Sequence, residues 1–252
     1  MVSLVQAVIL SIVQGITEWL PISSSGHLAL MQEFFGFQNL SYDVFLHFAS
    51  ILAVIIIFRK DIMSILRFDN RKKFVYAGLI ILAVIPAFIF GILLKNYIVT
   101  SFQNFLFLGL FFIFSGIVIY STKFSRGKNS QVRFVESLFI GTMQVFALFP
   151  GISRSGMTIS AGMFAGLKKK EAVRFSFLLA IPVILGASLA EATQILKTDI
   201  NYFILIISFI ITIFISLITI KLLIRIINND NFYLFGIYNF ILGVIVLIWS
   251  FF

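Results

Sequence analysis

The stretch "GITEWLPISSSGH", residues 15–27, places a glutamate, three consecutive serines and a histidine inside an otherwise apolar chain. The 252 residues are 60% hydrophobic and only 12% charged, with a mean hydropathy of +1.09. Water-soluble domains do not normally have this composition. We therefore expect an integral membrane protein, in which ionisable side chains at membrane depth need a partner or a function.

Around this stretch, the chain divides into apolar runs of the length that a membrane-spanning helix needs. Six runs qualify, at residues 42–58, 74–94, 104–122, 173–192, 202–224 and 232–251. Two further apolar stretches, residues 2–35 and 132–166, are interrupted midway by "LPISSSGH" and "FPGISRSGMT". Since proline lacks the amide hydrogen that a helix interior requires, we predict that each stretch forms two half-length helices.

The two interrupted stretches also mark an internal repeat. The segment "VSLVQAVILSIVQ" aligns with "VRFVESLFIGTMQ", and "ISSSG" aligns with "ISRSG". Near the ends of the halves, "LGLFFIFSGIVI" and "FGIYNFILGVIV" both carry glycines seven residues apart. Each half would then hold one broken pair and three spans, and an odd number of spans inverts the second half. The predicted fold class is an all-α membrane protein with an inverted-topology repeat, six transmembrane helices and two re-entrant broken helix pairs. Residues 1–252 form one membrane domain, with repeats at 1–126 and 127–252.

Basic residues give this topology its orientation. The predicted topology puts all but three of the 19 Lys and Arg residues on one face, leaving Lys95 and Lys197 on the other and Arg154 within the second motif. By the positive-inside rule, the basic face is cytoplasmic, so both termini and the opening of the site face outward from the plasma membrane. The net charge of +9 thereby has a topological explanation, and we expect no nucleic-acid partner. The absence of cysteine excludes disulfides and thiolate metal sites, and the N-terminus lacks the features of a secretory signal.

The two broken helices predict an anion site. Ser23, Ser24 or Ser25 can cap the helix that follows Pro21, and Ser153 or Ser155 can do so after Pro150. Helix N-termini present free N–H groups and a positive dipole end to an anion. Arg154 adds a planar fork suited to phosphate oxygens.

Phosphoryl transfer needs the charge of the transferred group neutralised and a nucleophile in line with it. His27 or Ser24 can supply the nucleophile, and we place His27 ahead of Ser24. Glu18 can act as a base, orient His27, or hold Mg2+ or Ca2+, with the Gln14 carbonyl as a further ligand. The candidate catalytic residues are Glu18, Ser24, His27 and Arg154, and the candidate substrate-binding residues are Gln14, Ser23, Ser25, Ser153, Ser155 and Thr158. Asp43 and His47, four residues apart where a span begins, we interpret instead as an interfacial helix start.

The paired stretches "QGITEWLPISSSGHL" and "PGISRSGMTIS" resemble the two signature regions of the bacitracin-resistance type of undecaprenyl-diphosphatase, and the similarity extends over nearly the whole chain. The resemblance implies removal of the terminal phosphate from a C55-type polyprenyl diphosphate, usually with Mg2+ or Ca2+, which regenerates the lipid carrier for cell-wall precursors. The family's acidic motif falls on Gln14 and Glu18, its serine and histidine on Ser24 and His27, and its second motif on Ser153, Arg154 and Thr158.

A carrier for a lipid phosphate or a small anion is the alternative function, because many transporters bind anions at broken helices. Glu18, Ser24 and His27 together favour an enzyme, since a binding site needs no nucleophile. The phosphatidic-acid phosphatase type 2 superfamily is excluded. Its later motif places a histidine a few residues after an arginine, whereas the stretch after Arg154 here, "SGMTISAGMFAG", contains no histidine. Homodimerisation is left open.

Overall fold

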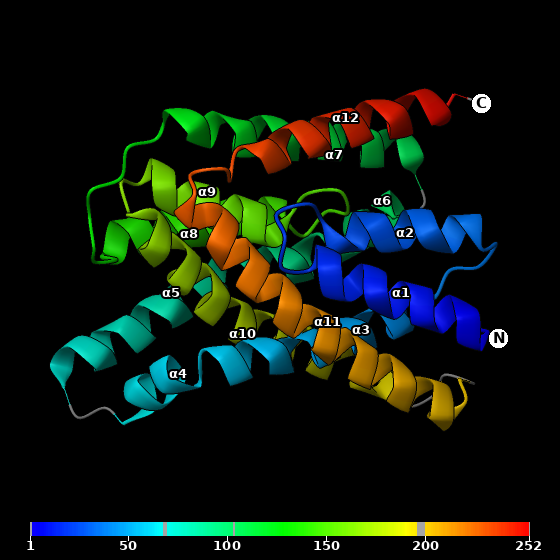
Figure 1. Ribbon diagram of the computed structural model, residues 1–252, viewed down its shortest axis with the longest axis horizontal. Coiled ribbons are helices and arrows are strands. Elements are labelled where there is room, and N and C mark those ends of the chain that lie inside the picture. Colours follow the sequence, from blue (N-terminus) through cyan, green and yellow to red (C-terminus); the bar gives the residue numbers. More distant parts are fainter. Residues whose placement is uncertain (1, 68–69, 103, 196–199, 252) are drawn as a thin grey trace.

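The computed structural model describes residues 2–67, 70–102, 104–195 and 200–251. The regular secondary structure in these ranges is helical, with loops between the helices, one 3₁₀ turn at Thr122–Phe124, and an isolated β-bridge between Asn129 and Leu167 (Figure 1). The twelve α-helices within them are α1 Leu4–Thr17, α2 Ser24–Phe34, α3 Leu40–Ile57, α4 Arg59–Leu66, α5 Arg71–Leu93, α6 Lys95–Ser101, α7 Phe105–Ser121, α8 Phe134–Phe146, α9 Arg154–Phe164, α10 Lys169–Ile195, α11 Tyr202–Asn228 and α12 Leu234–Trp249.

Five helices in the described ranges are long and apolar enough to cross a membrane, namely α3, α5, α7 with the turn that follows it, α10 and α11. They correspond to five of the six predicted spans. The sixth, predicted over residues 232–251, is α12, which has 16 residues and is shorter than a typical span. Multiple membrane-crossing helices are thus confirmed.

The two interrupted stretches form short helix pairs, as predicted. Helices α1 and α2 flank the first break, and α8 and α9 flank the second. Ser23 caps α2 by accepting from the Gly26 N–H at 3.3 Å, and Ser153 caps α9 by accepting from the Gly156 N–H at 3.0 Å. The aligned "SSSG" and "SRSG" sequences therefore begin helices with the same side-chain cap, although Ser23 has a φ of +66° and Ser153 a φ of −75°.

The loops of the two pairs contact each other directly. The Gly151 N–H donates to Ser23 Oγ at 3.1 Å, and Ser155 Oγ donates to the Leu20 carbonyl at 3.2 Å. Gly151 has a φ of +92°, and a Cβ there would lie 2.8 Å from the Leu108 carbonyl oxygen. Glycine therefore allows the second loop both its left-handed conformation and its close approach to α7.

Helices from the two halves of the chain pack in a reciprocal pattern. Helix α1 packs on α11 while α8 packs on α5, and α3 packs on α10 while α7 packs on α12. In the last pair, a Cβ on Gly109 would lie 3.0 Å from the Gly243 carbonyl, and one on Gly116 would lie 2.8 Å from the Gly236 carbonyl. These contacts run in opposite chain directions, so α7 and α12 are antiparallel, and the glycines seven residues apart form their interface.

The side-chain distribution is that of a protein surrounded by lipid. Large apolar side chains such as Phe88 on α5, Phe214 on α11 and Ile245 on α12 are exposed. Many hydroxyl groups lie inside, and some bond between helices: Tyr42 and Ser208 do so at 2.6 Å between α3 and α11. Apolar outer surfaces and polar interhelical contacts are what a hydrocarbon solvent favours.

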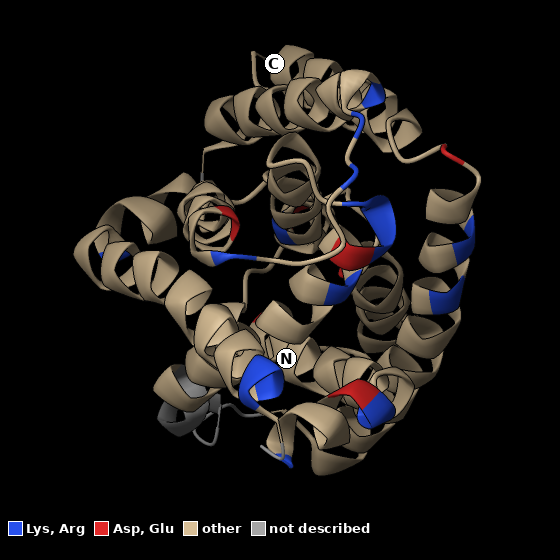
Figure 2. Ribbon diagram, turned by 90° about the vertical axis from the view of Figure 1, so that its left-hand side faces the viewer, with Lys and Arg blue, Asp and Glu red and all other residues tan. Residues whose placement is uncertain are grey.

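Both termini lie at one end of the molecule, together with the α2–α3 and α6–α7 connections (Figure 1). At the opposite end, α3, α7 and α11 finish and α5, α8 and α10 begin. The Lys and Arg residues of these segments gather around that end (Figure 2). The predicted separation of basic residues from the termini is therefore present in the fold.

Candidate phosphoryl-transfer site

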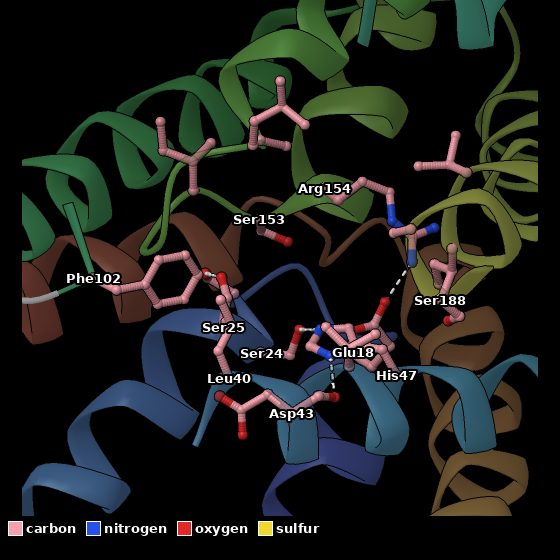
Figure 3. Close-up of a pocket in the computed structure, with 18 residues that line it drawn as sticks. Glu18, Ser24, Ser25, Leu40, Asp43, His47, Phe102, Ser153, Arg154 and Ser188 are labelled. Atoms are coloured by element: carbon pink, nitrogen blue, oxygen red, sulfur yellow. Dashed lines mark hydrogen bonds and ion pairs between the residues drawn. The ribbon is translucent and has the colours of Figure 1, made fainter. Parts of the chain in front are cut away.

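A pocket of about 230 Å³ lies where the two loops meet α3, the end of α6 and α10. Its walls include residues from both interrupted stretches, as the sequence predicted (Figure 3). Its polar lining residues are Glu18, Ser23, Ser24, Ser25, Asp43, His47, Ser153, Arg154 and Ser188.

Ser24 lies between a carboxylate and an imidazole. Its hydroxyl donates to Glu18 Oε2 at 2.6 Å, and its Oγ is 3.2 Å from His47 Nε2. His47 Nε2 is also 3.1 Å from Glu18 Oε2. A serine hydroxyl with a base in reach, and a carboxylate beside that base, is the arrangement of an activated nucleophile.

The backbone sets the tautomer that His47 needs for this role. Its Nδ1 is 2.7 Å from the Asp43 carbonyl oxygen, which only accepts hydrogen bonds. The Nδ1 proton is therefore held at that carbonyl, which leaves Nε2 facing both Ser24 Oγ and Glu18 Oε2. Asp43 itself lines the pocket and accepts from Gln32 Nε2 at 2.5 Å.

Arg154 crosses from the second loop to the first motif. Its Nη2 donates to Glu18 Oε1 at 2.5 Å, and its guanidinium lies over the Trp19 ring at 5.4 Å. Trp19 is fixed in turn by an edge contact with Phe177, with ring centroids 5.3 Å apart. Nη1 is buried and has no hydrogen-bond partner among the described residues. One arm of the fork thus holds Glu18, and the other remains open.

The N-termini of α2 and α9 both face the pocket, because their caps and first residues line it: Ser23, Ser24, Ser153 and Arg154. The first N–H groups of a helix have no intrahelical partner. Two converging N-termini with an arginine make a strong anion site.

The other predicted residues each contact a residue of the site. Gln14 Nε2 donates to Glu18 Oε2 at 3.1 Å. The Ser155 and Ser153 hydroxyls are 3.3 Å apart, as are those of Ser25 and Ser23. Thr158 does not line the pocket: its hydroxyl contacts Ser176 Oγ at 2.6 Å and the Arg154 carbonyl at 2.8 Å. It fixes the start of α9 on α10 instead of reaching an anion.

His27 does not line the pocket with Ser24, although we placed it ahead of Ser24 as the predicted nucleophile. Its Nε2 bonds to the Tyr238 hydroxyl at 2.7 Å, and its Nδ1 lies 2.8 Å from the Ser23 carbonyl. The ring stacks on Tyr238 and meets Phe112 edge-on. Residues three apart differ by roughly 60° around a helix, which at the start of α2 directs Ser24 to Glu18 and His27 to α12.

Asp43 and His47 do lie near the start of α3, as predicted, but both also line the pocket, which was not expected from the sequence. An ionisable pair in a membrane helix, spaced so that both share one face, was the available signal.

Gln14 and Glu18 offer side-chain oxygens of the kind that a divalent cation binds. Among the described residues there is no group of three His, Cys, Asp or Glu side chains placed to hold a metal. Gln14 Oε1, however, is a buried amide oxygen with no partner within the described ranges, and it stands beside the Glu18 carboxylate. Mg2+ commonly takes only one or two protein oxygens and completes its shell with phosphate and water.

Fold and site together define a multi-pass membrane protein with a polar pocket that holds a buried serine hydroxyl, a carboxylate, an imidazole and a guanidinium. The chain belongs to the family of bacitracin resistance protein BacA, whose family model matches residues 7–245. Its relatives include proteins named undecaprenyl-diphosphatase from Methanosphaera stadtmanae, 37% identical over 99% of both chains, and from Elusimicrobium minutum, 38% identical over 97% of both. The undecaprenyl-diphosphatase 1 of Shouchella clausii is 38% identical over 98% of this chain and 97% of its own. The family recognised from the sequence is confirmed.

Proposed function

We propose that this protein is a membrane phosphatase that hydrolyses undecaprenyl diphosphate to the monophosphate and inorganic phosphate. This activity recycles the lipid carrier and underlies bacitracin resistance. One observation carries the proposal: the Ser24 hydroxyl, held between Glu18 and His47, lies in the same pocket as Arg154 and two helix N-termini. An anion carrier needs the arginine and helix ends, but not an activated hydroxyl.

The reaction begins with Ser24 Oγ attacking the terminal phosphorus. His47 Nε2 takes the hydroxyl proton, and Glu18 stabilises the imidazolium that forms. As the Oγ–phosphorus bond forms, the bond from phosphorus to the bridging oxygen breaks, and polyprenyl monophosphate leaves with the electron pair and takes up the proton held by His47, which is then neutral again. Water then attacks the phosphoserine, His47 takes its proton, and Ser24 leaves as inorganic phosphate forms and regains a proton from His47.

Charge on the transferred phosphoryl group is balanced by fixed donors. Arg154 Nη1 and the first N–H groups of α2 and α9 are the available donors. They are rigid because Trp19, Glu18 and the two loops hold them before substrate arrives. Preorganised donors in a water-poor site stabilise a transition state more than solvent does.

Glu18 and Gln14 would hold Mg2+ or Ca2+ together with the diphosphate. The cation would neutralise phosphate charge as a Lewis acid. The unpartnered Gln14 Oε1 supports this assignment.

The apolar part of the pocket suits the first isoprene units. Its wall consists of Leu40, Val44, Phe102, Ala147, Leu148, Ile152, Val183, Ile184 and Ala187. A volume of about 230 Å³ accommodates a head group, so most of a C55 chain must remain in the bilayer.

We further infer that residues 1–126 and 127–252 are inverted repeats. The reciprocal packing of α1 on α11 and α8 on α5 supports a pseudo-two-fold axis, as does the antiparallel α7–α12 pair. Six spans, with α12 as the sixth, and two re-entrant pairs complete this topology.

The basic end is inferred to face the cytoplasm of the plasma membrane, with both termini outside. The pocket would then open outward, because Leu40, Phe102 and Ser188 belong to the helix ends on the side of the termini.

The test is phosphate release from C55 polyprenyl diphosphate by purified protein in detergent, with added Mg2+ or Ca2+ and with EDTA. We expect cation-dependent release that Ser24→Ala and Arg154→Ala abolish. Ser11→Ala is the matched control, because the Ser11 hydroxyl is buried in α1 but bonds to the Ala7 carbonyl. Folded wild type that binds the lipid without releasing phosphate would refute the phosphatase and favour a carrier.

A further inference from the structure

Ser188 is a pocket residue that neither motif contains. It lies on α10, is 7% exposed, and its hydroxyl has no hydrogen-bond partner in the described part of the chain. Among the described α10 residues that line the pocket, it alone is polar; the others are Val183, Ile184 and Ala187. In Figure 3, Ser188 lies below the Arg154 guanidinium, on the same side of the pocket.

Three buried helix hydroxyls have no partner in the described ranges, those of Ser160, Ser188 and Ser216, and of these only Ser188 lines the pocket. Ser11 and Ser121 donate to the carbonyl four residues back, and Ser50 and Ser250 donate three residues back. Such back-bonding is how serine is normally satisfied inside a helix. Ser188 makes no such bond, although a buried hydroxyl without a partner is unfavourable. A ligand that brings a hydrogen-bond acceptor into the pocket would satisfy the Ser188 hydroxyl.

A second unpartnered donor lies in the same pocket. Arg154 Nη1 is buried without a partner among the residues described, while Nη2 is held by Glu18. Both groups can donate, and the guanidinium cannot accept. Two buried donors with no acceptor of their own call for a ligand rich in acceptor oxygens.

We propose that Ser188 is a substrate-binding residue whose hydroxyl, together with Arg154 Nη1, donates to phosphate oxygens of the diphosphate head group. The identity of the ligand rests on the proposed function, whereas the need for an acceptor anion rests on the pocket itself. Ser188 also stands at the boundary between the phosphate-binding and apolar parts of the wall, since Val183, Ile184 and Ala187 continue its face along α10.

The test compares Ser188→Ala, Ser188→Thr and Ser216→Ala in steady-state phosphate release from C55 polyprenyl diphosphate. We expect Ser188→Ala to raise KM about tenfold or more with kcat changed far less, because a hydrogen bond to a charged oxygen is lost from the bound state. Ser188→Thr, which keeps the hydroxyl, should restore KM to within about threefold of wild type. Ser216 is the matched control: a buried α11 hydroxyl, also unpartnered in the described ranges, that lies outside this pocket.

A second measurement separates this inference from the phosphatase itself. Methylenediphosphonate, a diphosphate analogue that cannot be hydrolysed, should raise the thermal midpoint of wild type and Ser216→Ala, with an affinity about tenfold weaker for Ser188→Ala. Wild-type protein that binds the analogue about tenfold more tightly than Ser188→Ala and yet releases no phosphate from the lipid would refute the phosphatase and support the anion contact. Equal analogue affinity and equal KM in Ser188→Ala and wild type would overturn the inference. So would a KM increase matched by Ser216→Ala.

Discussion

His47 offers the sharpest test of the catalytic arrangement, through the substitution His47→Gln. The glutamine amide can still bond to Ser24, but it cannot take a proton. Positioned general bases typically contribute 10²–10⁴-fold to a rate. Because Ser24 already donates to Glu18 Oε2 at 2.6 Å, a second acceptor for the hydroxyl proton remains in the variant. The loss in rate should therefore lie at the lower limit of this range. We expect kcat to fall about 100-fold, or about 2.7 kcal/mol in activation free energy, with KM within about threefold of wild type.

The assay is steady-state phosphate release from C55 polyprenyl diphosphate in detergent, with the thermal midpoint of each variant measured alongside. His27→Ala provides the contrast, because His27 bonds to Tyr238 and to the Ser23 carbonyl instead of lining the pocket. We expect that variant to lower thermal stability and activity together. His47→Gln should lower kcat while leaving the midpoint nearly unchanged, since Glu18 keeps its Arg154 partner.

A His47→Gln protein that retains more than about a third of wild-type kcat would refute the assignment of His47 as the proton acceptor. A His27→Ala protein with unchanged stability but a kcat reduced 100-fold would instead restore His27 to the chemistry, as the sequence had suggested.

Three further predictions concern the cation, the loop and the α7–α12 interface. Gln14→Glu adds a carboxylate beside Glu18, so the Mg2+ concentration for half-maximal activity after EDTA treatment should fall roughly tenfold; an unchanged or higher requirement would contradict the cation assignment. Gly151→Ala forces a side chain into a φ of +92° and toward the Leu108 carbonyl, which should destabilise by about 1–3 kcal/mol and lower the thermal midpoint. Gly116→Ala places a Cβ 2.7 Å from Phe240 N and should cost about 1–3 kcal/mol while leaving KM unchanged; a midpoint equal to that of wild type would argue against the packed interface.

Local chemistry made much of this fold predictable. Prolines and capping serines determine where the two half-length helices break, and both signals lie within a few residues of their effect. The five long spans follow from hydropathy. Helix α12 was predicted too long, because hydropathy continues beyond Trp249 while the helix ends there.

The part of the site that was not predicted from the sequence, His47 and Ser188, depends on contacts between segments that lie far apart in the chain. His47 lies 23 residues beyond Ser24, and nothing in either motif indicates that α3 turns its Asp43–His47 face toward Glu18. Ser188 looks like any other small residue of a packed transmembrane helix. His27 misled for the opposite reason: its place in the motif suggested chemistry, whereas its direction is set by Tyr238, 211 residues away.

The two arms of the Arg154 guanidinium allow one arginine to contact both Glu18 and the substrate. A lysine in its place could neutralise Glu18 or a phosphate, but its ammonium has no rigid fork with which to hold both at fixed positions. Here Nη2 remains on Glu18 while Nη1 is open, so substrate binding need not break the buried ion pair. Breaking such a pair is strongly unfavourable, because it leaves a buried charge uncompensated. Glu18 therefore keeps its charge and its position beside His47 when the substrate binds.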